Sequence, residues 1–273
     1  MRFGIAAPNW GACGDPRFAA GLASAAEEAG WDGYFVWDGL IVRKDPPPVH
    51  DPWVILAAVA GATERVRIGT CIAVVPRYKP HLLAMRLASL DILSGGRMTL
   101  GVGLGDSGAR RSFEAFGEPA DPRTRAEMLD EGLDLIVRLW SGEEVVHRGK
   151  HYVVDGFALT ATPLQKPRIP IWVGGDSAPA IRRAARWDGW IGPDANPLDT
   201  RPQDVSDVGR RLQEAGAREE SFDIAWAGRS ASSDGDLVGR YGANGATWWI
   251  EVLLGEREAV AARVAEGPPT GEA

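Results

Sequence analysis

The chain has few of the residues that metal-binding and disulfide-bonded proteins need. Its 273 residues include only two cysteines and four histidines. Cys13 and Cys71 form no CxxC pair, which argues against a disulfide framework and against a zinc site, and favours a reducing compartment. His147 and His151 have no evident carboxylate partner, and two histidines alone make a poor metal site. We therefore expect no bound metal.

Clusters of basic residues and long apolar runs are also missing. The formal net charge is −7 and is spread along the sequence, whereas surfaces that bind nucleic acid or acidic membranes need clustered lysine and arginine. The first strand-like run begins at Arg2, with no apolar segment of the signal-peptide or membrane-anchor type. We expect a cytoplasmic protein that binds a small-molecule substrate and neither nucleic acid nor membrane.

Strand-like and helix-like patterns alternate along the chain. Short apolar runs predict eight strands, at 2–6, 33–36, 66–71, 97–103, 169–173, 189–191, 222–227 and 246–251. Helical patterns between them fall at 16–29, 52–62, 81–93, 123–140, 178–185, 202–214, 236–241 and 256–265. Eight such units predict an α/β fold, a single parallel (β/α)8 TIM barrel, for which about 250 residues is typical.

Two segments fall outside this alternation. Residues 145–167 predict a small hairpin before the fifth strand, in which His151–Val154 pairs with Phe157–Thr160 around Asp155-Gly156. Residues 267–273 are rich in proline and glycine and predict a flexible tail. The expected domain is therefore one barrel over residues 1–266.

Glycines recur at alternate positions of the predicted fourth strand. Because side chains alternate between the faces of a strand, Gly101, Gly103 and Gly105 leave one face bare. Glycine in a strand marks the close approach of another group, which is either a flat ligand ring or a large neighbouring side chain. Residues 103–108 also match the dinucleotide pattern GxGxxG, but residues 110–122 predict a long irregular excursion where a Rossmann turn needs a helix. We favour a ring-binding site that includes Gly103, Gly105 and Asp106.

Short motifs recur in order along nearly the whole chain. They include EEAGWD at 27–32, VWD at 36–38, IGT at 68–70, SGGR at 94–97, PIWVGGDS at 170–177 and AARWDGW at 184–190. Each is weak alone, but the ordered set resembles the bacterial-luciferase-like family of flavin- and F420-dependent oxidoreductases. The resemblance implies a dissociable F420 or FMN cofactor. In F420 enzymes it further implies a non-proline cis peptide around Cys71-Ile72-Ala73 that backs the cofactor ring.

The segment Gly174-Gly175-Asp176-Ser177 leaves a predicted strand and enters a predicted helix. Free N–H groups at a helix start, approached closely because glycine has no Cβ, form a phosphate cradle. The family places the cofactor phosphate on the matching loop. The alternative is a tight turn that needs glycine only for its backbone angles.

Candidate catalytic groups lie where strands end, because a barrel of this kind has its active site at the carboxyl ends of its strands. Asp38 ends the second strand, where the family often has Asp-His with the histidine facing the reacting ring. Here Gly39 follows instead, so we expect a larger pocket beside Asp38 and proton transfer by Asp38, Glu251 or solvent. His50 is the nearest replacement by sequence, with a solvated loop histidine as the alternative.

Tryptophans near strand ends offer flat faces to a substrate or ring. Trp10, Trp37 and Trp249 are expected to line the substrate pocket, with ordinary core packing as the alternative. The favoured function is hydride transfer with F420 to or from a small organic substrate, and the alternative is an FMNH2-dependent monooxygenase. A barrel hydrolase using Asp38 and Glu251, and a relative without catalysis, are more distant alternatives. A homodimer is a further expectation.

Overall fold

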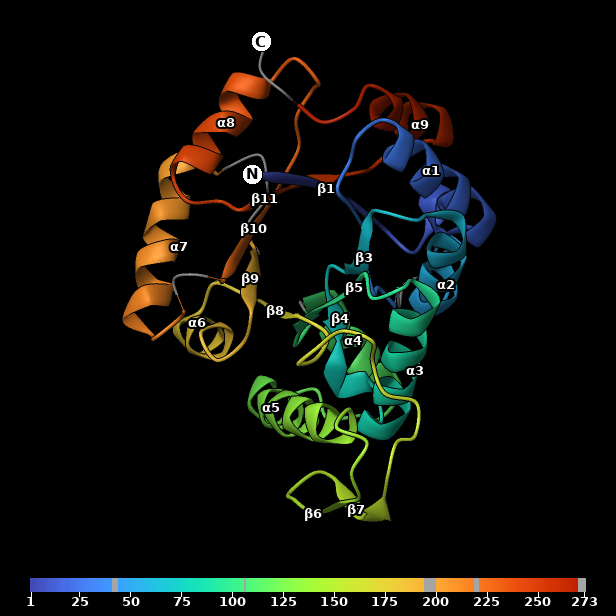
Figure 1. Cartoon of the computed structure of the whole chain (residues 1–273), viewed down its shortest axis with the longest axis vertical. Coiled ribbons are helices and arrows are strands. Elements are labelled where there is room, and N and C mark those ends of the chain that lie inside the picture. The colour runs from blue at the N-terminus through green and yellow to red at the C-terminus, as the bar shows by residue number, and fades with distance from the viewer. Residues whose placement is uncertain (41–43, 106, 194–199, 219–220, 270–273) are drawn as a thin grey trace.

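Parallel strands close into a barrel in the computed structural model, which describes residues 1–40, 44–105, 107–193, 200–218 and 221–269 (Figure 1). The barrel strands are β1 (Arg2–Ala7), β2 (Gly33–Val36), β3 (Arg67–Thr70) with its continuation β4 (Ala73–Val74), β5 (Met98–Gly103), β8 (Ile171–Gly174), β9 (Gly189–Gly192), β10 (Asp223–Gly228) and β11 (Trp248–Val252). Pairing of β1 with β11 and of β3 with β5 closes the ring. The predicted barrel is confirmed.

Helices follow the strands and surround the barrel. They are α1 (Pro16–Glu28), α2 (Pro52–Ala62), α3 (Pro80–Leu93), α4 (Ser107–Ala115), α5 (Pro122–Leu139), α6 (Ala178–Ala184), α7 (Pro202–Glu214), α8 (Gly235–Ala243) and α9 (Arg257–Ala265), with 3-10 turns η1 (Gly11–Gly14) and η2 (Val75–Arg77). Figure 1 shows α1 to α3 on one side of the barrel and α6 to α8 on the other. The described residues contain no helix long and apolar enough to cross a membrane.

Three helices begin with the same Asp-Pro pair. The side chains of Asp15, Asp51 and Asp121 accept hydrogen bonds from backbone N–H groups in the first turns of α1, α2 and α5. Proline follows each aspartate at the first helical position, where its missing N–H costs no hydrogen bond. These local signals explain why the starts of these helices are predictable from the sequence.

The apolar core has two layers, one inside the barrel and one between the barrel and its helices. Phe35, Trp172, Trp248 and Ile250 belong to the inner cluster, whereas Trp249 belongs to the outer one. Successive side chains of β11 therefore face opposite layers, as the pleat of a strand requires.

The inserted hairpin differs from the predicted one in its register. β6 (Val145–Arg148) pairs with β7 (Val153–Phe157), so the turn spans 149–152 and Asp155-Gly156 lies inside a strand. Glu131 of α5 accounts for the difference, because its carboxylate accepts the N–H groups of His151 and Tyr152 at 3.0 and 2.9 Å. It also bonds Nε2 of His147 at 3.0 Å.

The two hairpin histidines do have carboxylate partners, contrary to our expectation. Besides the pair of His147 with Glu131, Nε2 of His151 lies 3.2 Å from Glu127. No three such side chains gather as a metal site among the described residues.

Residues 107–115 form helix α4 where the sequence predicted an irregular excursion. The Phe113 ring is fully buried, with the guanidinium groups of Arg77 and Arg125 5.8 and 5.1 Å from its centre. These tertiary contacts stabilise a helix whose sequence signal is weak. A dinucleotide turn is still excluded, but by the closed barrel and not by a missing helix.

The start of the predicted C-terminal tail packs on the barrel. Gly267 is buried, and its carbonyl accepts a hydrogen bond from Nη1 of Arg263 at 2.8 Å. Residues 270–273 lie outside the described residues.

Candidate active site

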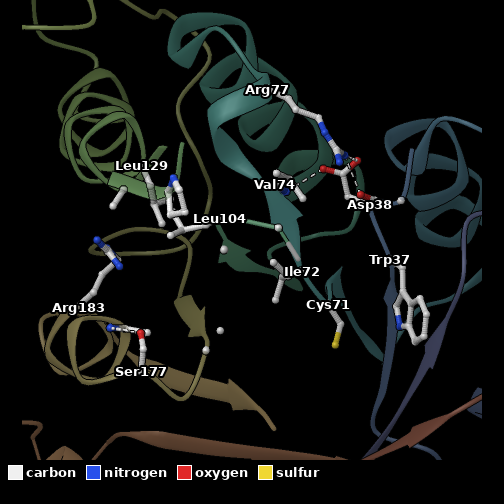
Figure 2. Close-up of a pocket in the computed structure, with 18 of the residues that line it drawn as sticks. Trp37, Asp38, Cys71, Ile72, Val74, Arg77, Leu104, Leu129, Ser177 and Arg183 are labelled. Atoms are coloured by element: carbon white, nitrogen blue, oxygen red, sulfur yellow. Dashed lines mark hydrogen bonds and ion pairs between the residues drawn. The ribbon is translucent and has the colours of Figure 1, made fainter. Parts of the chain in front are cut away.

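A cavity of about 1000 Å³ opens where the barrel strands end (Figure 2). Most of the residues predicted for the site line it, namely Trp10, Trp37, Asp38, Gly39, Cys71, Ile72, Gly103, Gly105, Gly174, Gly175 and Ser177. Leu40, Val74, Leu104 and Leu129 add apolar surface. A pocket of this size, largely apolar with a few polar groups, is typical of a site for a small molecule or cofactor.

The floor of the cavity is built around Ile72. The peptide bond between Cys71 and Ile72 is cis, which confirms the expectation drawn from the family resemblance. A Cβ added at Gly103 would overlap Cδ1 of Ile72, and one at Gly174 would lie 3.3 Å from its Cγ2. Glycine at these two positions therefore lets the Ile72 side chain lie across the strand ends.

The bare glycine face of β5 accommodates neighbouring protein groups. Ile72 fills the space in front of Gly103, and a Cβ at Gly101 would overlap the backbone oxygen of Thr70. At Gly101 and Gly103 the prediction that a ligand ring lies directly on the bare face is therefore wrong, since the groups that approach closely are the end of β3 and the Ile72 side chain. Asp106, also predicted here, lies outside the described residues.

The loop from Gly174 to Ser177 is fixed by contacts from three elements. Gly175 has φ +114°, a left-handed conformation that side chains rarely adopt. Its carbonyl accepts Nε1 of Trp190 at 2.9 Å, and the carbonyl of Asp176 accepts Nη2 of Arg211 at 2.5 Å. Asp176 is not among the cavity-lining residues, whereas Ser177 lines it and caps α6.

Four arginines line the cavity, and sequence reasoning missed them. They are Arg77 of η2, Arg111 of α4, Arg123 of α5 and Arg183 of α6. Arg183 is nearly buried and holds Asp130 through two bonds of 2.6 and 2.9 Å. Figure 2 shows Arg183 and Ser177 on one side of the cavity and Trp37 on the other. Cationic and aromatic side chains thus both line the cavity.

The carboxyl group of Asp38 is held by its neighbours. Oδ2 accepts the N–H of Val74 at 2.8 Å, and Nη1 of Arg77 lies 2.9 Å from the Asp38 carbonyl and 3.4 Å from Oδ1. Burial raises the pKa of Asp38, while the Arg77 charge and the Val74 N–H act in the opposite direction. Both oxygens are thus directed toward η2 and its flanks, as Figure 2 shows.

Asp38→Asn is expected to gain stability relative to the wild type as pH rises. A carboxyl whose pKa is raised in the folded state stabilises fully below its unfolded value of about 3.9 and loses that contribution as pH rises through the folded value. Asparagine retains the shape and stays neutral. We expect the Tm of the variant minus that of the wild type to increase from about pH 4 to about pH 8. Asp155→Asn, at an exposed hairpin carboxylate, is the control; a difference that shrinks with rising pH would show that Arg77 outweighs burial.

Trp10 occupies the space beside Gly39 that we expected to be open. A Cβ at Gly39 would overlap Cζ3 of Trp10 and lie 2.8 Å from its Cε3. The prediction of a larger pocket at this point is therefore wrong. The indole of Trp10, in the loop after β1, fills the space left by the missing side chain at position 39.

Four of the described residues predicted for the site do not line the cavity, namely Asp176, Glu251, Trp249 and His50. Glu251 and Trp249 lie on the outer face of β11, where Glu251 accepts the N–H of Ser230 at 2.9 Å and Nε1 of Trp249 at 3.1 Å. The predicted carboxylate pair of Asp38 and Glu251 is therefore not formed. His50 lies against Gly14, and its backbone pairs with Asn9.

The chain resembles known proteins in sequence and in fold. A family model described as luciferase-like monooxygenase matches residues 1–240. The F420-dependent hydroxymycolic acid dehydrogenase of Mycobacterium tuberculosis is 32% identical over 225 residues, which cover 79% of this chain and 61% of that protein. The F420-dependent glucose-6-phosphate dehydrogenase of Nakamurella multipartita is 36% identical over 181 residues, 64% of this chain and 52% of that protein.

One solved structure illustrates the shared fold. An F420-dependent secondary alcohol dehydrogenase, in complex with an F420-acetone adduct, superposes with a TM-score of 0.80 at 19% identity and covers 98% of each chain. The chain spans only about half to three fifths of the length of the two sequence relatives above. The family match over residues 1–240, together with the closed barrel and the ordered motifs, shows that this chain belongs to the luciferase-like monooxygenase family.

Proposed function

We propose that this protein is an oxidoreductase that uses coenzyme F420 as a hydride carrier for a small organic substrate. The observation that carries the proposal is a cavity lined both by four arginines, Arg77, Arg111, Arg123 and Arg183, and by apolar and aromatic side chains. F420 matches such a lining, because a flat deazaflavin ring is joined to a tail that carries a phosphodiester and carboxylates. The names of the two F420-dependent sequence relatives support the choice.

The residues present fit such a group. The backbone N–H groups of the Gly174–Ser177 loop and the Ser177 hydroxyl would hold the phosphate, and Arg183 would face the anionic tail. Ile72, which the glycines of β5 and β8 let lie across the strand ends, would support the ring. When bound, reduced F420 supplies a hydride to the substrate.

The chain itself contributes orientation and the exclusion of water. Trp10, Trp37, Leu104 and Leu129 surround the cavity with apolar surface, which strengthens electrostatic interactions within it. Asp38 touches the cavity, but its oxygens are engaged by Val74 and Arg77. We assign it the role of holding η2 against the end of β2, which positions the residues around Ile72.

Titration of the purified protein with F420 and with FMN tests the proposal. FMN is the cofactor of the alternative function, a monooxygenase, which the family name supports. Unlike F420, FMN has a single phosphate and no carboxylates. One additional charge-assisted hydrogen bond to the F420 tail is worth about 1.5 kcal/mol, so we expect F420 to bind about tenfold more tightly. Tighter binding of FMN would favour the monooxygenase, and binding of neither would contradict both.

We further propose that two copies of this chain associate through the outer faces of α2 and α3. Helix α2 (PWVILAAVAGA) has no charged, amide or hydroxyl side chain, although its outer face bears the exposed Val54. On the neighbouring α3, Leu82, Met85 and Ile92 are 41 to 46% exposed and follow one helix face. Contiguous exposed apolar surface is typical of protein interfaces.

Met85→Glu is expected to shift the protein from dimer to monomer. A carboxylate buried at an interface without a partner costs several kcal/mol, which weakens association by about a hundredfold or more. Light scattering coupled to size exclusion measures the mass. Leu237→Glu on α8, on the opposite side of the barrel, is the control and should stay dimeric. A monomeric wild type would refute the proposal.

A cytoplasmic location completes the proposal. Cys13 and Cys71 are both free thiols, which is typical of proteins in reducing compartments.

A further inference from the structure

The loop after β1 is locked to the end of β2 by one buried side chain. Asn9 is 1% exposed, and its amide bonds both backbone groups of Gly39, with Oδ1 accepting the N–H at 2.9 Å and Nδ2 donating to the carbonyl at 3.0 Å. Nδ2 also donates to the carbonyl of His50 at 2.8 Å. The Asn9 side chain thereby binds the backbone of two other segments, at Gly39 and at His50.

The same lock fixes the ring of Trp10. This residue follows Asn9, and its backbone forms an antiparallel bridge with Val49. Its six-membered ring lies against Gly39, and its side chain meets that of Trp37 edge to face, with ring centres 5.3 Å apart and planes inclined at 65°. Both tryptophans line the cavity, and Figure 2 shows Trp37 on the side opposite Arg183. An aromatic corner, defined here as Trp10 and Trp37, is therefore held rigidly on both sides.

We propose that Trp10 is the specificity-determining residue of this site and that the aromatic corner selects substrates with a planar, unsaturated apolar group. Planar rings gain edge-to-face or offset contacts with a fixed indole that saturated rings of the same size do not. Because Asn9 holds Trp10 in place before the ligand arrives, little side-chain freedom is lost on binding. The inference rests on the proposed function, because it assumes that the planar group of the substrate lies next to an F420 ring supported by Ile72.

Binding of two matched probes tests the proposal. 2-Naphthol and decahydro-2-naphthol have the same carbon skeleton and hydroxyl, but only the first is planar. Aromatic contacts are worth about 0.5 to 1.5 kcal/mol beyond area, so calorimetry with the wild type should show a preference for 2-naphthol of about threefold to tenfold. Trp10→Ala should abolish this preference and Trp10→Phe should retain most of it. Trp187→Ala, a partly buried tryptophan outside the cavity lining, should leave it unchanged.

The outcomes distinguish a failure of the Trp10 proposal from a failure of the proposed function. Thermal melts first establish that each variant is folded, and Phe at position 10 provides a folded comparison if Ala does not. Equal affinities of the two probes in the wild type, or a preference that survives in Trp10→Ala, would overturn the proposal. F420 titration on the same preparations is read separately. If the wild type does not bind F420, the proposed function is refuted. The preference for 2-naphthol still tests the role of Trp10 in that case.

Discussion

A Gly175→Val variant is expected to bind F420 and FMN about a hundredfold more weakly than the wild type. Valine does not tolerate the φ of +114° at this position, so the loop must change its backbone path at a cost of about 1–3 kcal/mol. The loop N–H groups that we propose to hold the phosphate then lose their alignment. Loss of two charge-assisted hydrogen bonds, each about 1.5 kcal/mol, accounts for the expected factor. Fluorescence titration measures the affinity.

Gly216→Val provides the matched control for backbone strain. Gly216 has φ +93°, no heavy atom lies within 4 Å of its added Cβ, and it follows α7 away from the cavity lining. This variant should lose a similar amount of thermal stability, a few degrees in Tm, and keep its cofactor affinity. If a folded Gly175→Val variant binds F420 and FMN as tightly as the wild type, the Gly174–Ser177 loop does not hold the cofactor phosphate.

Gly39→His is expected to lower the stability markedly, and Trp10→Ala in the same chain is expected to restore it. A Cβ at position 39 overlaps the Trp10 ring, and overpacking of this kind costs about 1–3 kcal/mol. Removing the indole frees that volume. Thermal melts of the two single variants and the double variant measure the coupling. The double variant should be less destabilised than the sum of the two single variants, because residues 10 and 39 are in contact.

The double variant also tests whether position 39 belongs to the reacting end of the cavity. An imidazole there should add a group that titrates near pH 6.5 to the pH dependence of turnover, once a substrate has been identified. Trp10→Ala alone is the control for the lost indole. Additive stability effects would contradict the contact, and identical pH profiles would show that the imidazole faces away from the reaction.

The barrel was predictable because its signals are local. A few neighbouring residues determine where each strand ends and where each Asp-Pro helix starts. All eight predicted strands occur in the structure. The placement of Glu251 and Trp249 failed for a different reason. Both faces of a parallel barrel strand are covered by apolar layers, so the sequence of β11 does not reveal whether odd or even residues face the interior.

The other errors are also non-local. Gly39 shows that a side chain is missing, but only the fold shows that Trp10 fills the gap from another loop. Arg111, Arg123 and Arg183 lie within or at the start of helices, where arginine is ordinarily solvated, so nothing in their neighbourhood marked them as cavity residues.

Arg77 joins the end of β2 to helix α4, since its guanidinium donates to the Asp38 carbonyl and to the Ser112 hydroxyl at 2.9 and 3.3 Å. The position of α4 and the protonation of Asp38 are therefore thermodynamically linked. A displacement of α4 that moved Arg77 would change the electrostatic field at the Asp38 carboxyl and the number of protons it binds. By reciprocity, the protonation state of Asp38 would influence the position of α4.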